Sequence, residues 1–192
     1  RPEPGTTDDE FAGRSPRYMQ VVDIHNPLTP TRLFTVPMVA YPGGMIGVAG
    51  QRLYSGWPAN GIELFDISAP DRPLSEGLID LYPGFGVVSH GNTLFSYSFT
   101  TSHLHIYDVS MPQRPRRLSS LAVNGYMVAV SNDGNVVYVS SPGGDATWLV
   151  DVSDRKKPRK LGELSVAGTP RTTGELLFLL GPSATYLYNI TD

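Results

Sequence analysis

One stretch of sequence recurs along the chain at a nearly constant interval, and this repeat limits the folds that the chain can adopt. Each copy is a short apolar segment that ends in Asp23, Asp66, Asp108 or Asp151, and a fifth copy has Asn189 in the same place. Successive copies are 43, 42, 43 and 38 residues apart. A regular period of this length predicts a repeat architecture, in which each unit stacks on the next to bury a continuous core.

Each unit divides further into four short segments separated by turn residues. In one unit these are residues 45–50, 52–57, 62–68 and 74–82. The segments lack the 3.6-residue spacing of helices, so we expect strands nearly everywhere. The chain also contains 20 Gly and 17 Pro, a share typical of all-β proteins with many turns. A period of about 40 to 45 residues with four antiparallel strands predicts an all-β fold of β-propeller blades, with about four blade repeats in this chain.

We predict a structural role for the Asp that ends each apolar segment. Its carboxylate can accept a hydrogen bond from a backbone N–H group in the following turn, and Asn can do the same. A Pro stands seven positions after each of the four Asp residues, where it fixes φ in a segment that leaves the sheet. A row of metal-binding carboxylates is the less favoured interpretation, because blades place these turns far apart around one face.

These features together resemble the LVIVD-repeat β-propellers. Besides the Asp strand and its Pro-containing turn, the resemblance rests on a turn followed by a Val- and Ala-rich strand, at residues 41–44 with 47–50, 82–84 with 87–91, and 124–125 with 128–131. It covers about residues 18–191 and implies a propeller that often belongs to exported or cell-surface bacterial proteins. We therefore expect an extracellular or cell-envelope location. The last copy, residues 169–174, lacks the Val-Ala core, which leaves open how its inner strand packs.

The repeat also sets the expected domain boundaries. Residues 1–17 are predicted to be a flexible tail or the remnant of a preceding blade, and residues 18–192 the propeller repeat domain. Three complete blades and three strands of a fourth are expected, at residues 44–82, 85–122 and 126–166, then 169–173, 176–181 and 184–190. Residues 31–37 could complete the last blade and close a four-bladed ring. The alternative, which we favour, is part of a larger propeller of roughly six to eight blades.

Composition excludes several classes of function. The net charge of −3 gives no general attraction to nucleic acid or anionic lipid. The absence of Cys excludes disulfides, thiolate metal sites and cysteine nucleophiles. The apolar run at residues 176–180 is much shorter than the roughly 20 residues of a membrane helix, so direct membrane insertion is not expected. No cofactor is expected either.

The candidate binding residues are aromatic and lie at loops on one face of the predicted blades. Strand order puts the outer-to-inner loops and the loops between second and third strands on the same face. Aromatic rings at such loops bring a large contact area at low entropic cost, which suits a protein or glycan partner. The alternative is that these rings pack between neighbouring blades. The predicted ligand-binding residues are Tyr41, Trp57, Tyr82, Phe85, Phe99 and Tyr126.

The sequence offers little for catalysis or for a metal. His103 and His105 share a strand face, a spacing that can chelate an ion, but no third ligand is evident and we favour an ordinary surface pair. Basic segments at 114–117 and 155–160 are interpreted as a solvated rim, with docking of an acidic partner as the alternative. We therefore predict a non-catalytic interaction scaffold. The alternative is a propeller enzyme, a hydrolase or lyase with its site at the channel mouth.

Overall fold

The described residues of the protein form β-strands arranged in five antiparallel sheets. The computed structural model describes residues 18–39, 46–57, 61–82, 86–141 and 143–191, and of Trp57 it describes the backbone alone. Within these ranges it contains no helix. The predicted tail at residues 1–17 lies outside the described residues.

The strands follow the repeat, with consecutive strands paired as neighbours in each sheet. The first sheet contains β1 (Tyr18–Asp23) and β2 (Thr31–Pro37). The second contains β3 (Ile46–Ala49), β4 (Arg52–Trp57), β5 (Gly61–Asp66) and β6 (Leu74–Ile79). The third contains β7 (Gly86–His90), β8 (Thr93–Ser98), β9 (His103–Asp108) and β10 (Arg116–Ala122). The fourth contains β11 (Met127–Val130), β12 (Val136–Ser140), β13 (Thr147–Asp151) and β14 (Arg159–Leu164). The last contains β15 (Thr169–Thr173), β16 (Leu176–Leu180) and β17 (Thr185–Asn189).

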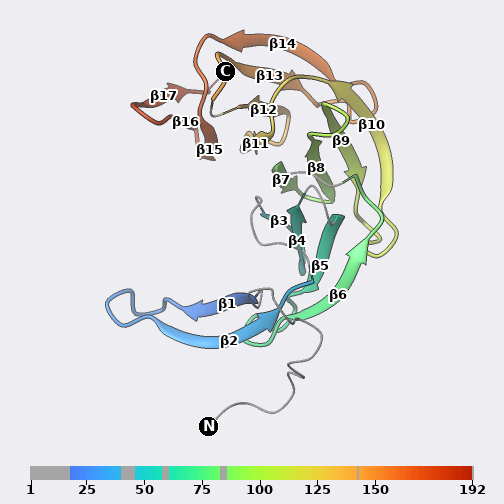
Figure 1. The fold of residues 1–192 in the computed structure, drawn as a ribbon, viewed down its shortest axis with the longest axis vertical. Helices are drawn as coiled ribbons and strands as arrows, with labels where there is room; N and C mark the ends of the chain where they lie inside the picture. Colours follow the sequence, from blue (N-terminus) through green and yellow to red (C-terminus); the bar gives the residue numbers. More distant parts are fainter. Residues whose placement is uncertain (1–17, 40–45, 58–60, 83–85, 142, 192) are drawn as a thin grey trace.

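The sheets lie one after another around an arc, as Figure 1 shows. The first strands of the last four sheets, β3, β7, β11 and β15, line the inside of the arc, and each contacts the next. The outermost strands β6, β10 and β14 lie on the outside (Figure 1). This radial stacking of four-stranded units confirms the predicted β-propeller fold.

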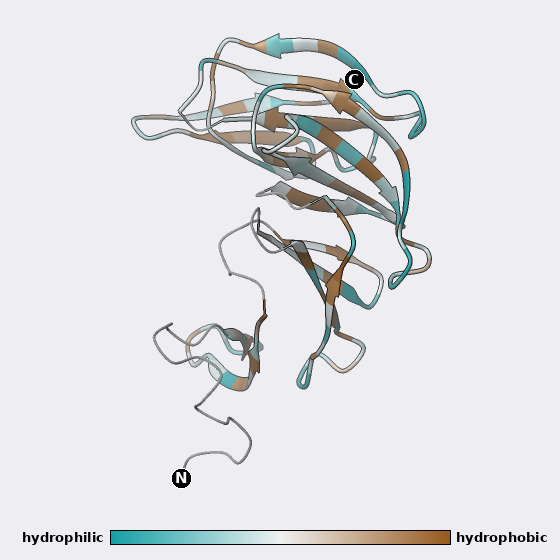
Figure 2. Cartoon of the chain, turned by 45° about the vertical axis from the view of Figure 1, so that its right-hand side comes forward, coloured by the Kyte–Doolittle hydropathy of each residue, from teal (hydrophilic) through white to brown (hydrophobic). Residues whose placement is uncertain are grey.

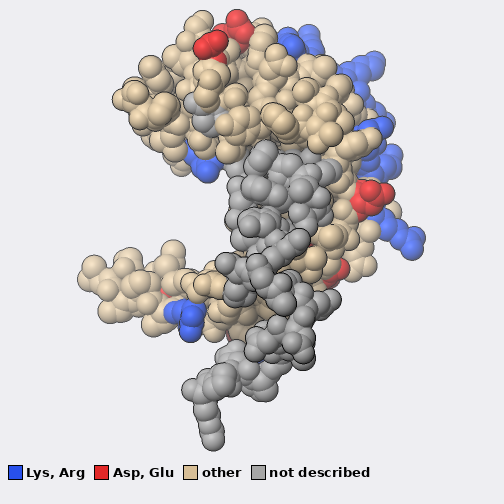
Figure 3. Space-filling view, viewed as in Figure 1, with Lys and Arg blue, Asp and Glu red and all other residues tan. Residues whose placement is uncertain are grey.

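The core lies between the sheets: the second, third and fourth sheets each pack between two neighbours, and the first and last sheets each pack against one. The middle strands are buried almost throughout, and in β8 Leu94, Phe95 and Tyr97 are at most 2% exposed. The outermost strand β14 is exposed along most of its length. Figure 2 shows apolar residues along the sheets and hydrophilic ones in the turns. Lys and Arg side chains gather along the edge where β10 and β14 lie (Figure 3).

The Asp of each repeat forms the predicted turn. Its Oδ1 accepts a hydrogen bond from the backbone N–H two residues later in every copy, for example 2.8 Å from Ser68 N to Asp66 and 2.9 Å from Ser153 N to Asp151. Asn189 makes the equivalent bond with Thr191 N, at 3.0 Å. The bond from Ser68 N lowers the pKa of the Asp66 carboxyl, and bonds from the Ser153 hydroxyl, Ser153 N and Arg159 lower the pKa of Asp151 to about 2. The structural interpretation of the repeat Asp is confirmed.

Residues 31–37 do not close a four-bladed ring, which was the less favoured of the two predicted arrangements. These residues form β2, which pairs with β1 along Tyr18–Asp23 and not with β17. Within the described residues, β17 pairs only with β16, so the last sheet has three strands. The inner strand β15 packs on β11 despite lacking the Val-Ala core, because the Thr172 hydroxyl donates to the Val130 carbonyl at 2.7 Å.

Candidate binding site on the loop face

The six predicted binding residues do not all lie in the described part of the chain. Tyr41 and Phe85 fall outside the described residues. Trp57 ends β4, where its backbone pairs with Gly61. The structure describes the side chains of Tyr82, Phe99 and Tyr126, and it separates Tyr82 from the other two.

Phe99 and Tyr126 line one cleft between the third and fourth sheets. The cleft has a volume of about 410 Å³ and also includes Asn124, Asp145 and Trp148. Phe99 stands in the β8–β9 loop and is 61% exposed. Tyr126 precedes β11 and is half-buried. The loops that form the cleft are of the two predicted kinds, second-to-third-strand and outer-to-inner, so both meet on the same face.

The floor of this cleft is held by hydrogen bonds and by a glycine. The Tyr97 hydroxyl donates to the Val123 carbonyl at 3.1 Å, and burial raises its pKa, which keeps the donor protonated. Gly125 has φ of 153°, and a Cβ there would lie 2.7 Å from Val139 Cγ1. Tyr126 N donates to Ser140 O at 3.0 Å. The cleft is therefore preformed, and a ligand would not have to order it.

The chemistry of this cleft combines aromatic surface with exposed polar groups. Phe99, Tyr126 and Trp148 offer ring faces and edges, and the Lys160 ammonium lies 4.5 Å from the centroid of the Trp148 ring. Asn124 and Asp145 are exposed and can exchange hydrogen bonds with a ligand. Anchoring rings beside a few polar groups are typical of binding hot spots.

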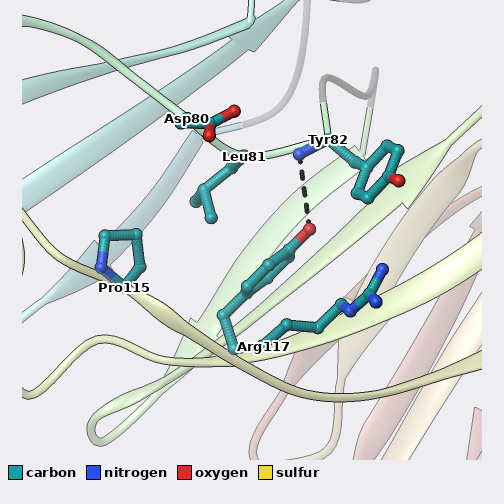
Figure 4. Close-up of a pocket in the computed structure, with 6 residues that line it drawn as sticks. Asp80, Leu81, Tyr82, Pro115 and Arg117 are labelled. Atoms are coloured by element: carbon teal, nitrogen blue, oxygen red, sulfur yellow. Dashed lines mark hydrogen bonds between the residues drawn. The ribbon is translucent and has the colours of Figure 1, made fainter.

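Tyr82 lies in a different pocket, between the second and third sheets (Figure 4). Its ring stacks on His105 with centroids 4.5 Å apart and planes 6° apart, and the Arg117 guanidinium carbon lies 5.7 Å from the ring centroid. Its backbone N–H donates to the Tyr107 hydroxyl at 3.3 Å, the bond drawn in Figure 4. The pocket has a volume of about 510 Å³, and Asp80 forms part of its lining. The Tyr82 ring thus packs against the third sheet but stays 45% exposed, and its role in binding stays a prediction.

The histidine pair differs from the expected surface pair. His105 is only 3% exposed, while the neighbouring His103 ring is 6.0 Å away, centroid to centroid. Burial, the Arg117 charge and His103 together lower the pKa of His105 to about 4, so its ring is neutral near pH 7. Its Nδ1 is buried and has no hydrogen-bond partner within the described residues. Those residues contain no cluster of three or more side chains that could hold a metal ion.

Trp148 lines the cleft of Phe99 and Tyr126, and His105 stacks on Tyr82, but neither is among the six candidate residues from the sequence. Both stand three positions before the repeat Asp, and Glu63 occupies that position in the second sheet. Glu63 is fully buried and accepts a 3.0 Å hydrogen bond from Val39 N, in the connection that leads into its own sheet. This position of the repeat thus faces the incoming connection in three sheets. Aligning the repeats could have identified it.

The central hollow presents a different surface. The inner strands line a space of about 660 Å³ whose walls include Val48, Val88, Ala129 and Arg171. Val48 is 49% exposed.

In the described parts of the chain, no helix is both long and apolar enough to span a membrane.

Comparison with known proteins supports the fold and shows no family. No family model and no curated protein sequence matches the chain. Among solved structures, a functionally unknown protein from Desulfotomaculum acetoxidans has a TM-score of 0.70 at 17% identity, over 90% of this chain and 61% of that one. A putative 6-phosphogluconolactonase from Bacteroides fragilis has a TM-score of 0.66 at 12% identity, over 90% and 60%. The Cps50 (Swd1) β-propeller domain from Myceliophteria thermophila has a TM-score of 0.60 at 16% identity, over 90% and 62%. The chain thus spans about 60% of the length of these structures.

Proposed function

We propose that this protein is a non-catalytic interaction module that binds a protein partner on its loop face, at the cleft between Phe99 and Tyr126. The observation that carries the proposal is Phe99, a large aromatic side chain that is 61% exposed at the mouth of a preformed cleft. Aromatic residues are enriched in protein interfaces, and a few anchoring side chains carry most of the binding energy there.

We prefer a protein partner to a glycan because the loop face has two clefts, each at a different interface between sheets. The Phe99 cleft lies between the third and fourth sheets, and a further cleft of about 390 Å³, also lined by Asp145, lies between the fourth and last sheets. A protein surface can contact both clefts at once, whereas a short glycan fills one. The same face would then present a continuous binding surface to a protein.

We further propose that the chain belongs to the LVIVD-repeat propellers and to an exported or cell-surface protein. The five Asp- or Asn-containing turns with their shared hydrogen bond support this family, since the motif that defines the resemblance is also the motif that builds each turn. Location can be tested by fractionating cells of the source organism with an antibody against the chain. Signal confined to the cytosol would contradict the exported location.

The binding proposal can be tested with peptides selected from a random phage-displayed library on the wild-type protein. Phe99→Ala should weaken the selected peptides by roughly thirtyfold, the loss typical of an aromatic hot spot. Leu28→Ala is the matched control, because Leu28 is 90% exposed in the β1–β2 turn, away from the cleft. It should leave affinity unchanged.

The same variants on a glycan array separate the two partner classes. Selected peptides that bind wild type and Phe99→Ala equally well would contradict the proposed site. Glycan binding that Phe99→Ala abolishes, without any peptide binding, would assign the cleft to sugars and overturn the protein partner.

A further inference from the structure

Basic side chains gather on the outer rim of the third and fourth sheets, at the end opposite the loop face. They come from residues 114–117, in the β9–β10 turn and the start of β10, and from residues 155–160, in the β13–β14 turn and the start of β14. We call these two segments the basic rim. Figure 3 shows Lys and Arg atoms concentrated along this edge, although the chain as a whole has a net charge of −3.

The two segments of the basic rim are held side by side. The Ser119 hydroxyl, on β10, donates to the Arg155 carbonyl at 2.6 Å and joins the third sheet to the β13–β14 turn. The Arg155 guanidinium carbon lies 5.4 Å from the centroid of the Phe95 ring, in the third sheet, and Arg155 Nη1 donates a hydrogen bond to the Val152 carbonyl. The fold therefore brings together charges that are about 40 residues apart in sequence.

The fold does not require all of these cations, although Arg72 keeps a basic residue at the position of Arg114 and Lys157. The second sheet builds the same turn, with Arg72 N donating to Ala69 O at 2.9 Å, as Lys157 N donates to Asp154 O at 3.0 Å. Yet Asp71 stands where the fourth sheet has Lys156. Likewise, Leu74 and Ser75 of β6 stand where β14 has Arg159 and Lys160. Protection of an exposed outer strand does not explain the difference, because β6 is also an outermost strand.

Only part of the charge of the basic rim is used within the fold. Arg116 pairs with Asp108 at 3.2 Å, and Arg159 with Asp151 at 2.9 Å. The side chains of Arg114, Lys156 and Lys157 are exposed and form no ion pair with any residue that the structure describes. These three cations are available to a partner.

We infer that the basic rim is a second binding surface, for an acidic polypeptide segment that also carries apolar side chains. The apolar component follows from Met111, 66% exposed in the same β9–β10 turn, and Leu161, 53% exposed directly after Lys160. A polysaccharide or a nucleic acid backbone would use the cations and leave these apolar side chains in water. An acidic peptide with interspersed Leu residues uses both.

The test uses the whole chain and a fluorescein-labelled peptide of alternating Glu and Leu, followed by fluorescence anisotropy. The triple variant R114E/K156E/K157E should weaken binding by roughly tenfold to a hundredfold, because each reversal replaces an attraction with a repulsion. R72E is the matched control, since Arg72 holds the position of Arg114 and Lys157 in the second sheet. It should change the affinity by less than about threefold.

The mechanism also predicts that salt weakens binding and that a Gln-Leu peptide binds far more weakly than the Glu-Leu peptide. Circular dichroism verifies that the triple variant is folded, as expected for three exposed side chains. Equal affinity of the wild type and the triple variant would overturn the inference. So would binding of heparin without binding of the Glu-Leu peptide, because the rim would then recognise a polyanion of a different class.

Discussion

Gly86→Ala should destabilise the protein because neighbouring blades come closest at their inner strands. A Cβ on Gly86, in β7, would lie 2.7 Å from Tyr126 O, 2.9 Å from Val128 Cγ2 and 3.1 Å from Val128 N. Two of these three atoms belong to the backbone and cannot move aside as a flexible side chain would. Relief therefore requires a shift of the third sheet against the fourth.

Overpacking of this kind costs about 1–3 kcal/mol in well-packed cores. With about 2–4 °C of Tm per kcal/mol for a chain of this size, Tm should fall by roughly 2–12 °C. The assay is thermal unfolding followed by circular dichroism, together with urea titration to obtain the free energy of unfolding.

Gly162→Ala provides the matched control. Gly162 also lies in a strand, β14, but a Cβ there meets no atom within 4 Å. Ala has fewer backbone conformations than Gly in the unfolded chain. Where the folded backbone accepts Ala, the substitution should therefore stabilise the protein by about 0.4–1 kcal/mol. Equal unfolding free energies for the two variants would refute close packing between β7 and β11.

Replacing Asp151 by Ala removes its bond from Ser153 N and its ion pair with Arg159, and should cost about 0.5–1.5 kcal/mol in urea titrations. Asp151→Asn keeps the turn bond, as Asn189 does, so it should cost less; equal costs would contradict the turn-forming role. Because the pKa of Asp151 is lowered from 3.8 to about 2, the stability that it contributes is present above pH 3.8 and is lost as pH falls towards 2, a loss that should be smaller in Asp151→Asn. The pKa of His105 is lowered from 6.5 to about 4, so the unfolded state binds the extra proton and stability should fall as pH drops through that window. His105→Phe should show a flatter dependence of the urea midpoint on pH there, and an unchanged slope would contradict the burial of a neutral His105.

The repeat was sufficient to predict the blades, because the features that form each strand and turn depend on residues close together in the sequence. The Asp that accepts a bond from the residue two positions later, as Asp66 does from Ser68, is one such requirement. The short alternation of strands and turns is another. These features placed the strands of the last four sheets to within a few residues of the observed ones.

The site was only partly predictable, because it depends on how one sheet faces the next. Sequence placed Phe99 and Tyr126 on the same face, and the structure puts them in one cleft. It did not reveal that Tyr82 stacks on the buried His105, since these residues meet only across the interface between two sheets. The pairing of β2 with β1 was not predicted, because the only strand partner proposed for residues 31–37 was the last blade.

The face-to-face packing of blades is tested most directly by proton NMR cross-peaks between neighbouring inner strands. A Cβ built on Gly47, in β3, would lie 3.3 Å from Val87 Cγ1 and 3.2 Å from Leu94 Cδ1, both in the next sheet. The packing predicts strong cross-peaks from the Gly47 α protons to the methyl groups of Val87 and Leu94. A spectrum that contains the contact between Gly47 and its strand partner Tyr54 but lacks both of these would show that the sheets form without stacking as blades.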